Sequence, residues 1–199
     1  IAPLTIYSKK YNSVDEIKAA AGENGTAQVA KNALKLAIPN DGTNQSRGIK
    51  LLESAGFIEV NPAAGYTPEL KDITKYLYNV EVLPQAANTL PSTLDDYAGA
   101  TINGTYAIPQ KLIPSKDGLL IEKQDESGNN PYVNIIVSRT SDKDNATYKK
   151  IVDAFHSQIV AEYILGKFKE AYYPSFDYVE KNADAYNATV ELVDAAIKL

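Results

Sequence analysis

Short apolar runs rich in β-branched and aromatic residues alternate with polar turns over the first two thirds of the chain. Each such run predicts a β-strand. The run YVNIIV inside residues 131–139 is the strongest of these signals, because isoleucine, valine and tyrosine fit a pleated sheet well. The predicted strands are residues 1–8, 34–38, 79–84, 118–125 and 131–139.

Apolar residues at helical spacing fill much of the sequence between these strands. Ser13 and Glu16 form a capping-box pattern, which predicts a short helix that stops at Gly22. Similar patterns predict helices at residues 46–55, 67–77, 90–99, 145–168 and 177–199. Residues 27–33 are compatible with either a helix or a strand. The alternation predicts an α/β fold, a mixed or parallel sheet flanked by helices, with further helices at the C-terminal end.

Composition narrows the classes of function. The 199 residues are 44% hydrophobic with a net charge of −5, which suits one domain or two small lobes and disfavours nucleic acid or an anionic membrane as partner. The chain has no cysteine, so disulfides, thiolate nucleophiles and cysteine zinc sites are excluded. It has no methionine and starts at Ile1, so we expect a processed, truncated or excised product. No charged and then apolar leader opens it, so we expect no targeting segment in these residues.

The stretch AIPNDGTNQSRG, residues 37–48, is the first candidate site. A strand that ends in a Gly/Asn/Asp turn and continues into a helix points free N–H groups beyond the sheet edge, where open α/β sheets bind ligands. Thr43 and Asn44 can cap this helix or donate hydrogen bonds, and Arg47 can hold a carboxylate in a bidentate contact. The alternative is an ordinary capped helix with a surface arginine.

Two asparagines interrupt apolar surroundings and are further candidates. Asn103 lies in ATINGTYA and Asn134 in YVNIIV. A buried amide needs a hydrogen-bond partner, and a ligand in a cleft can supply one. The alternatives are a turn asparagine beside Gly104 and a strand asparagine bonded to backbone.

No candidate for catalysis, metal binding or a cofactor emerges. His156 is the only histidine and lies in an amphipathic helix, so a structural role is expected. Asp142 and Asp144 lack the central glycine and terminal glutamate of a calcium loop. The residues therefore predict an α/β binding protein for a small anionic or zwitterionic ligand.

Five segments carry a family resemblance: YSKKYNSVDEI, AIPNDGTNQSRGIKLLESAGFIEV, LPSTLDDYAGATINGTYAI, PSKDGLLIEK and NPYVNIIVSR. In order and spacing, the chain resembles the NlpA lipoprotein family, the methionine-binding components of ABC importers, across roughly residues 1–176. The resemblance implies a lipid-anchored, extracytoplasmic protein with two periplasmic-binding-protein lobes, which closes over a free amino acid and performs no catalysis. It also implies that Arg47 holds the ligand carboxylate and that Asn103 and Asn134 bind its polar end. Membrane subunits of an importer are the implied partner.

The same resemblance assigns regions of the chain. Residues 1–8 would be a hinge strand, 9–131 the second lobe, 132–139 a return hinge strand, and 140–176 helices of the first lobe, with an extra helix at 177–199 that has no counterpart in the pattern. Gly42 stands where the family usually has proline. The anchor cysteine and most of the first lobe's sheet have no match here, so we expect self-association or an incomplete site. The open alternatives are another amino acid, a short peptide, or an interaction or adhesion module derived from this fold.

Overall fold

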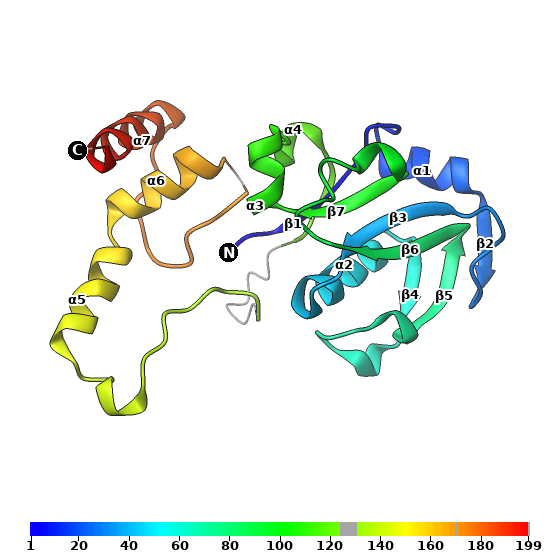
Figure 1. Cartoon of the computed structure of the whole chain (residues 1–199), viewed down its shortest axis with the longest axis horizontal. Coiled ribbons are helices and arrows are strands. Elements are labelled where there is room, and N and C mark those ends of the chain that lie inside the picture. Colours follow the sequence, from blue (N-terminus) through cyan, green and yellow to red (C-terminus); the bar gives the residue numbers. More distant parts are fainter. Residues whose placement is uncertain (124–130, 170, 199) are drawn as a thin grey trace. The chain divides into compact units, whose positions relative to one another are not determined.

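The computed structural model describes residues 1–123, 131–169 and 171–198. Its residues divide into an N-terminal unit, Pro3–Gln124, and a C-terminal unit that combines Ile1–Ala2 with Asp125–Leu199. All strands of the described ranges belong to the N-terminal unit, and the three longest C-terminal helices belong to the other (Figure 1).

The N-terminal unit holds a five-stranded and a three-stranded sheet. The first has the order β6-β3-β7-β1-β8, and the second has the order β2-β5-β4. The strands are β1 (Leu4–Tyr7), β2 (Glu23–Thr26), β3 (Leu34–Pro39), β4 (Ile58–Val60), β5 (Ile73–Tyr78), β6 (Val80–Gln85), β7 (Gly99–Asn103) and β8 (Gly118–Ile121). The helices are α1 (Val14–Ala21), α2 (Gly42–Ser54), α3 (Gly104–Ala107) and α4 (Pro114–Asp117).

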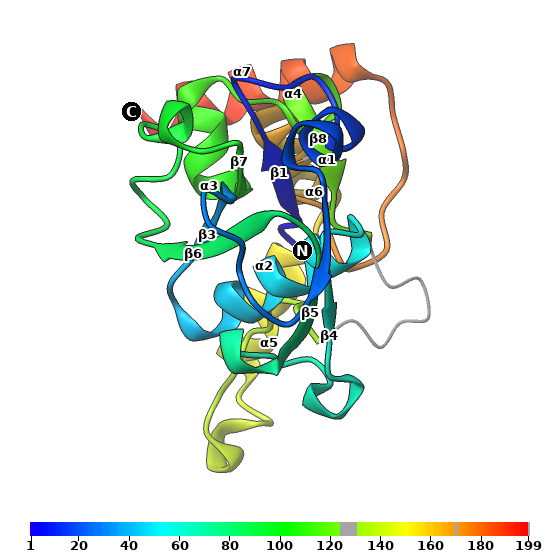
Figure 2. The ribbon, with the colours of Figure 1, turned by 90° about the vertical axis from the view of Figure 1, so that its right-hand side faces the viewer.

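The larger sheet is mixed, as expected. β3 pairs in parallel with β6 and with β7, whereas β1 runs antiparallel to both β7 and β8. Figure 2 shows β3 and β6 running side by side. Because β3, β6 and β7 are mutually parallel, their carboxyl ends meet at one edge of the sheet.

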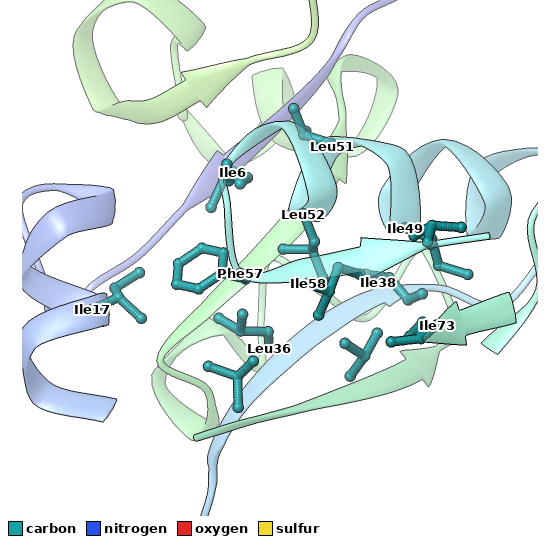
Figure 3. Packing of buried hydrophobic residues seen from close by; sticks show 14 of the residues in the cluster. Ile6, Ile17, Leu36, Ile38, Ile49, Leu51, Leu52, Phe57, Ile58 and Ile73 are labelled. Carbon is teal, nitrogen blue, oxygen red and sulfur yellow. The ribbon is translucent and has the colours of Figure 1, made fainter. Parts of the chain in front are cut away.

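An apolar core joins α1 and α2 to the larger sheet. The side chains of Ile17, Leu36 and Leu52 gather around the ring of Phe57 (Figure 3), and all four are at most 1% exposed. α2 approaches the sheet closely at Gly48, where an added Cβ would lie 3.0 Å from both Ile38 Cβ and Thr101 Oγ1. Glycine at this position therefore fixes how near the helix lies to the strands.

A second, smaller core contains Tyr7, whose burial raises the pKa of its hydroxyl to about 12 from 10.0. The unfolded chain releases this proton near pH 10, whereas the folded chain keeps it, so stability falls as pH rises from 10 towards 12. We expect the free energy of unfolding to fall by up to about 2 kcal/mol between pH 10 and pH 12. Tyr7→Phe should abolish this loss. Urea unfolding at several pH values measures it. Tyr106 is exposed, so Tyr106→Phe should leave the loss of stability between pH 10 and pH 12 the same as in the unchanged chain.

Two predicted helices of this unit are wrong. Residues 67–77 instead form a 3₁₀ turn, Leu70–Asp72, and most of the strand β5, because ITKYLY is rich in residues that favour strands and pairs with two neighbouring strands. Within residues 90–99 the only helical element is the 3₁₀ turn Leu94–Asp96, and Gly99 already begins β7. The hydroxyls of Ser92 and Thr93 both bond the carbonyl of Thr89, which competes with helix formation.

The C-terminal unit contains α5 (Ala146–Phe155), α6 (Gln158–Phe168) and α7 (Ala183–Ile197), as the apolar spacing predicts. The strand predicted at 131–139 is wrong, since no strand forms there. Within the described part of this unit no other strand exists to pair with it, and Ile135 and Val137 are 76% and 77% exposed. A strand needs a hydrogen-bonded neighbour whatever its propensity. The assignment of the chain's regions to lobes and hinges stays a prediction.

Candidate functional site

A cavity of about 420 Å³ lies where the carboxyl ends of β3, β6 and β7 meet. Its lining comes from the segments that directly follow these strands and from the start of α2. The lining residues are Asn40, Asp41, Asn44, Ala86, Ala87, Asn88, Asn103, Thr105 and Tyr106. Amide and carboxylate groups dominate its polar wall, which suits a ligand that brings hydrogen-bond donors.

The start of α2 is organised by Asp41. Its carboxylate accepts from the backbone N–H of Asn44 at 3.2 Å and from Asn44 Nδ2 at 2.9 Å, so Asp41 is the helix cap. Thr43 is exposed in the first turn and does not cap the helix. An acidic cap already stabilises the positive end of the helix dipole, which makes this N-terminus less open to a second anion than the sequence suggests.

Arg47 is buried, with 6% of its surface exposed, and lies within a polar network. Nη1 donates to Asn44 Oδ1 at 3.2 Å, and Nε donates to Glu122 Oε1 at 3.0 Å while Nη2 donates to Glu122 Oε2. Asn103 Nδ2 donates to the same Asn44 oxygen at 3.0 Å. Asn44 therefore links the guanidinium to Asn103, so the structure brings together three of the predicted site residues.

Glu122 is the residue that sequence reasoning missed. It directly follows β8, and its backbone N–H donates to the carbonyl of Leu4 while its carboxylate accepts from the N–H of Leu4 at 2.9 Å. The sequence offers one signal for this residue. A single acidic residue follows the apolar run GLLI, and a charged side chain is unusual at a position where burial is expected. Two hydrogen bonds join the guanidinium of Arg47 to the carboxylate of Glu122, so the arginine of α2 holds a carboxylate from within the chain.

Asn103 carries the one unusual polar atom of this site. Its Oδ1 is buried and has no hydrogen-bond partner among the residues that the structure describes. A buried acceptor without a donor costs roughly 1–3 kcal/mol, so a donor from a bound molecule would be stabilising. Asn103 also lines the cavity, which places this acceptor in its wall.

Asn134 belongs to the C-terminal unit, where it is exposed and contributes to a separate cavity of about 420 Å³ lined mostly by apolar and aromatic side chains. Across residues 1–123, 131–169 and 171–198, no group of three acidic, histidine or cysteine residues could hold a metal ion. In the same ranges, no helix combines the length and apolar character needed to cross a bilayer.

Comparison with known proteins adds a family match. The family model described as NlpA lipoprotein matches residues 1–176. The D-methionine-binding lipoprotein MetQ of Salmonella typhimurium is 37% identical over 164 residues, which cover 81% of this chain and 54% of that protein. MetQ of Escherichia coli K12 is 35% identical with the same coverage. The chain thus spans about half the length of the curated relatives it matches.

The comparison with solved structures also gives matches to this chain. A nutrient-binding protein from Burkholderia cenocepacia, bound to methionine, has a TM-score of 0.72 at 33% identity, covering 88% of this chain and 67% of its own. Protein PG110 from Staphylococcus aureus has a TM-score of 0.73 at 30% identity, covering 97% of this chain and 69% of its own. A coverage of 97% extends past residue 176, so much of 177–199 has a structural counterpart there.

Proposed function

Because the chain belongs to the NlpA lipoprotein family, we propose that it is an extracytoplasmic substrate-binding protein. It captures a free amino acid and delivers it to the membrane subunits of an ABC importer. Methionine is the ligand we expect, since the curated relatives are D-methionine-binding lipoproteins and a structural neighbour was solved with methionine bound. The observation that carries the proposal is the line of hydrogen bonds from Arg47 through Asn44 to Asn103 beside the cavity.

The hydrogen-bonding groups of Arg47, Asn44 and Asn103 are complementary to those of a zwitterionic amino acid. The ammonium group of an amino acid needs acceptors, and the buried Oδ1 of Asn103 offers one without placing another charge in the interior. The carboxylate needs a cation, which is Arg47. An arginine fork has five N–H donors in one plane. Arg47 holds Glu122 on its Nε–Nη2 edge and Asn44 at Nη1, and we propose that a ligand carboxylate joins this network beside Asn44.

The remaining parts of the proposal are predictions from the sequence and from the family. We assign Asn134 to the polar end of the ligand, and Thr43 to ligand binding at the first turn of α2. We expect a lipid-anchored location at the membrane, no catalytic activity and no cofactor. Self-association stays a prediction that light scattering can test.

We expect that Asn103→Ala weakens methionine binding about 10- to 100-fold in isothermal titration calorimetry, because the ligand loses a buried acceptor. Both L- and D-methionine should be titrated, together with other amino acids and short peptides. Asn187→Ala is the matched control, since Asn187 is exposed on α7 and the same side chain is removed.

Three possible results would correct or reject the proposal. Binding of another amino acid or of a short peptide, lost in Asn103→Ala, would keep the site and correct the ligand. Equal affinity of the Asn103 and Asn187 variants would reject the site. No heat with any amino acid would reject amino-acid capture by this chain.

A further inference from the structure

The cavity beside Asn103 has one charged side chain among the described residues that line it, the carboxylate of Asp41. The other polar side chains of the lining are neutral, since they belong to four asparagines, a threonine and a tyrosine. No lysine or arginine is among these described lining residues. A wall with acceptors and one negative charge favours a ligand that carries a positive group.

The positive charge of Arg47 is already balanced within the chain. Its guanidinium pairs with the carboxylate of Glu122 through Nε and Nη2, and the two side chains are only 8% and 17% exposed. An ion pair has no net charge, so it attracts a further anion less strongly than an unpaired arginine would. When the formal charges of this network are added, Arg47 and Glu122 cancel and the negative charge of Asp41 remains.

Asp41 has one carboxylate oxygen that its role as helix cap does not use. Oδ1 accepts both hydrogen bonds from Asn44, at 3.2 Å from the backbone nitrogen and 2.9 Å from Nδ2. Oδ2 accepts no hydrogen bond from any residue that the structure describes. The cavity therefore offers an ammonium group a charged acceptor at Asp41 in addition to the neutral acceptor, Oδ1, of Asn103.

We propose that Asp41 makes this site select its ligand by charge. The site binds α-amino acids with an uncharged side chain, and it rejects carboxylic acids that lack the ammonium group. A zwitterion offsets the repulsion of its carboxylate by Asp41 through the attraction of its ammonium group. A simple carboxylate has no such compensation, and Arg47, paired with Glu122, offsets little of the repulsion. This inference rests on the proposed function, because it concerns the same site.

The test compares methionine with its 2-hydroxy analogue, 2-hydroxy-4-(methylthio)butanoate, by isothermal titration calorimetry on the full chain near neutral pH. The analogue keeps the thioether, the carboxylate and one hydrogen-bond donor, but a neutral hydroxyl replaces the ammonium group. The unchanged chain should bind it at least about 30-fold more weakly than methionine. Asp41→Asn should weaken methionine binding about 3- to 10-fold and should not weaken binding of the analogue. The ratio of the two affinities should therefore fall at least about threefold.

Asp41→Asn removes the charge and keeps the start of α2, because asparagine caps helices as well as aspartate does. Asp41→Ser also keeps a capping oxygen without a charge and should lower the ratio by a similar factor. Asp15→Asn is the matched control, since Asp15 lies in the first turn of α1 and its side chain is 92% exposed. This variant should leave both affinities unchanged.

Two results would overturn the charge selection while the proposed function stands. One is equal affinity of the unchanged chain for methionine and its analogue. The other is an unchanged ratio in Asp41→Asn, including an equal loss of both ligands, which would mean that Asp41 acts only through the structure of α2. If another amino acid binds in place of methionine, it is compared with its own 2-hydroxy acid in the same way. No heat with any amino acid would reject the proposed function, and this inference with it.

Discussion

Arg47→Ala should weaken methionine binding at least about 100-fold and also destabilise the N-terminal unit by about 3–5 kcal/mol. The two effects have different causes. Binding falls because the ligand carboxylate loses its charge-assisted fork. Stability falls because Glu122, whose side chain is 17% exposed, keeps a buried charge without its cation. Calorimetry measures the first effect, and urea unfolding followed by circular dichroism measures the second.

The chain's second arginine is the matched control. The side chain of Arg139 is 82% exposed and pairs with Asp142 three residues later. Exposed pairs of this kind contribute about 0–1 kcal/mol, so Arg139→Ala should change neither affinity nor stability appreciably.

Glu122→Gln separates the two roles of Arg47. It weakens the internal ion pair but leaves the guanidinium in place for a ligand. If Arg47 served only this pair, Arg47→Ala would leave the affinity for methionine unchanged when measured under conditions where the variant stays folded.

Gly118→Ala should destabilise the N-terminal unit by about 2–3 kcal/mol through overpacking. Gly118 begins β8, and an added Cβ would lie 2.4 Å from the carbonyl oxygen of Pro114 and 2.5 Å from Thr5 Cγ2. Its backbone angles, φ −79° and ψ 137°, are ordinary for any residue, so only the space is limiting. One of the two atoms is backbone of the helix α4, which cannot rotate away as a side chain could. The midpoint of urea unfolding measures the loss.

Gly42→Ala is the control for this substitution. Gly42 begins α2, has nothing within 4 Å of an added Cβ, and is not among the positive-φ glycines. Alanine there should leave stability unchanged or raise it by a few tenths of a kcal/mol. An equal loss in both variants would mean that the effect at Gly118 does not come from the clash.

Sequence patterning succeeds where local signals and tertiary context agree. The strands around Leu36 and Val82 combine β-branched residues with burial on the sheet, and the helix around Leu52 has both a polar cap and an apolar face. At residues 67–77 the signals conflict, since Thr67 and Pro68 resemble a helix start while Ile73–Tyr78 is rich in isoleucine, threonine and tyrosine, which favour strands. The competition was decided by pairing with β2 and β4, which no local window contains.

The candidate site was predictable in its residue types but not in its connections. The turn after β3 identified Asn44 and Arg47, and an amide among apolar neighbours identified Asn103. The link between Arg47 and Glu122 joins residues 75 positions apart, and only the sheet order brings them together. Asn134 was placed on a strand that does not form, so its predicted contact with the ligand rests on the family alone.

The position of β1 has a consequence for folding kinetics. This strand precedes the other strands of the unit in sequence, yet it lies inside the larger sheet between β7 and β8, with Leu4 opposite Asn103 and Thr5 opposite Ile121. Leu4 pairs with the segment around Glu122, 118 positions later, so the sheet cannot close until that segment has been synthesised. Until then Leu4 and Ile6 stay unpaired and exposed to wrong partners, and closing so long a loop slows folding. We therefore expect this unit to fold only after β8 has been synthesised and to profit from chaperones that shield apolar segments.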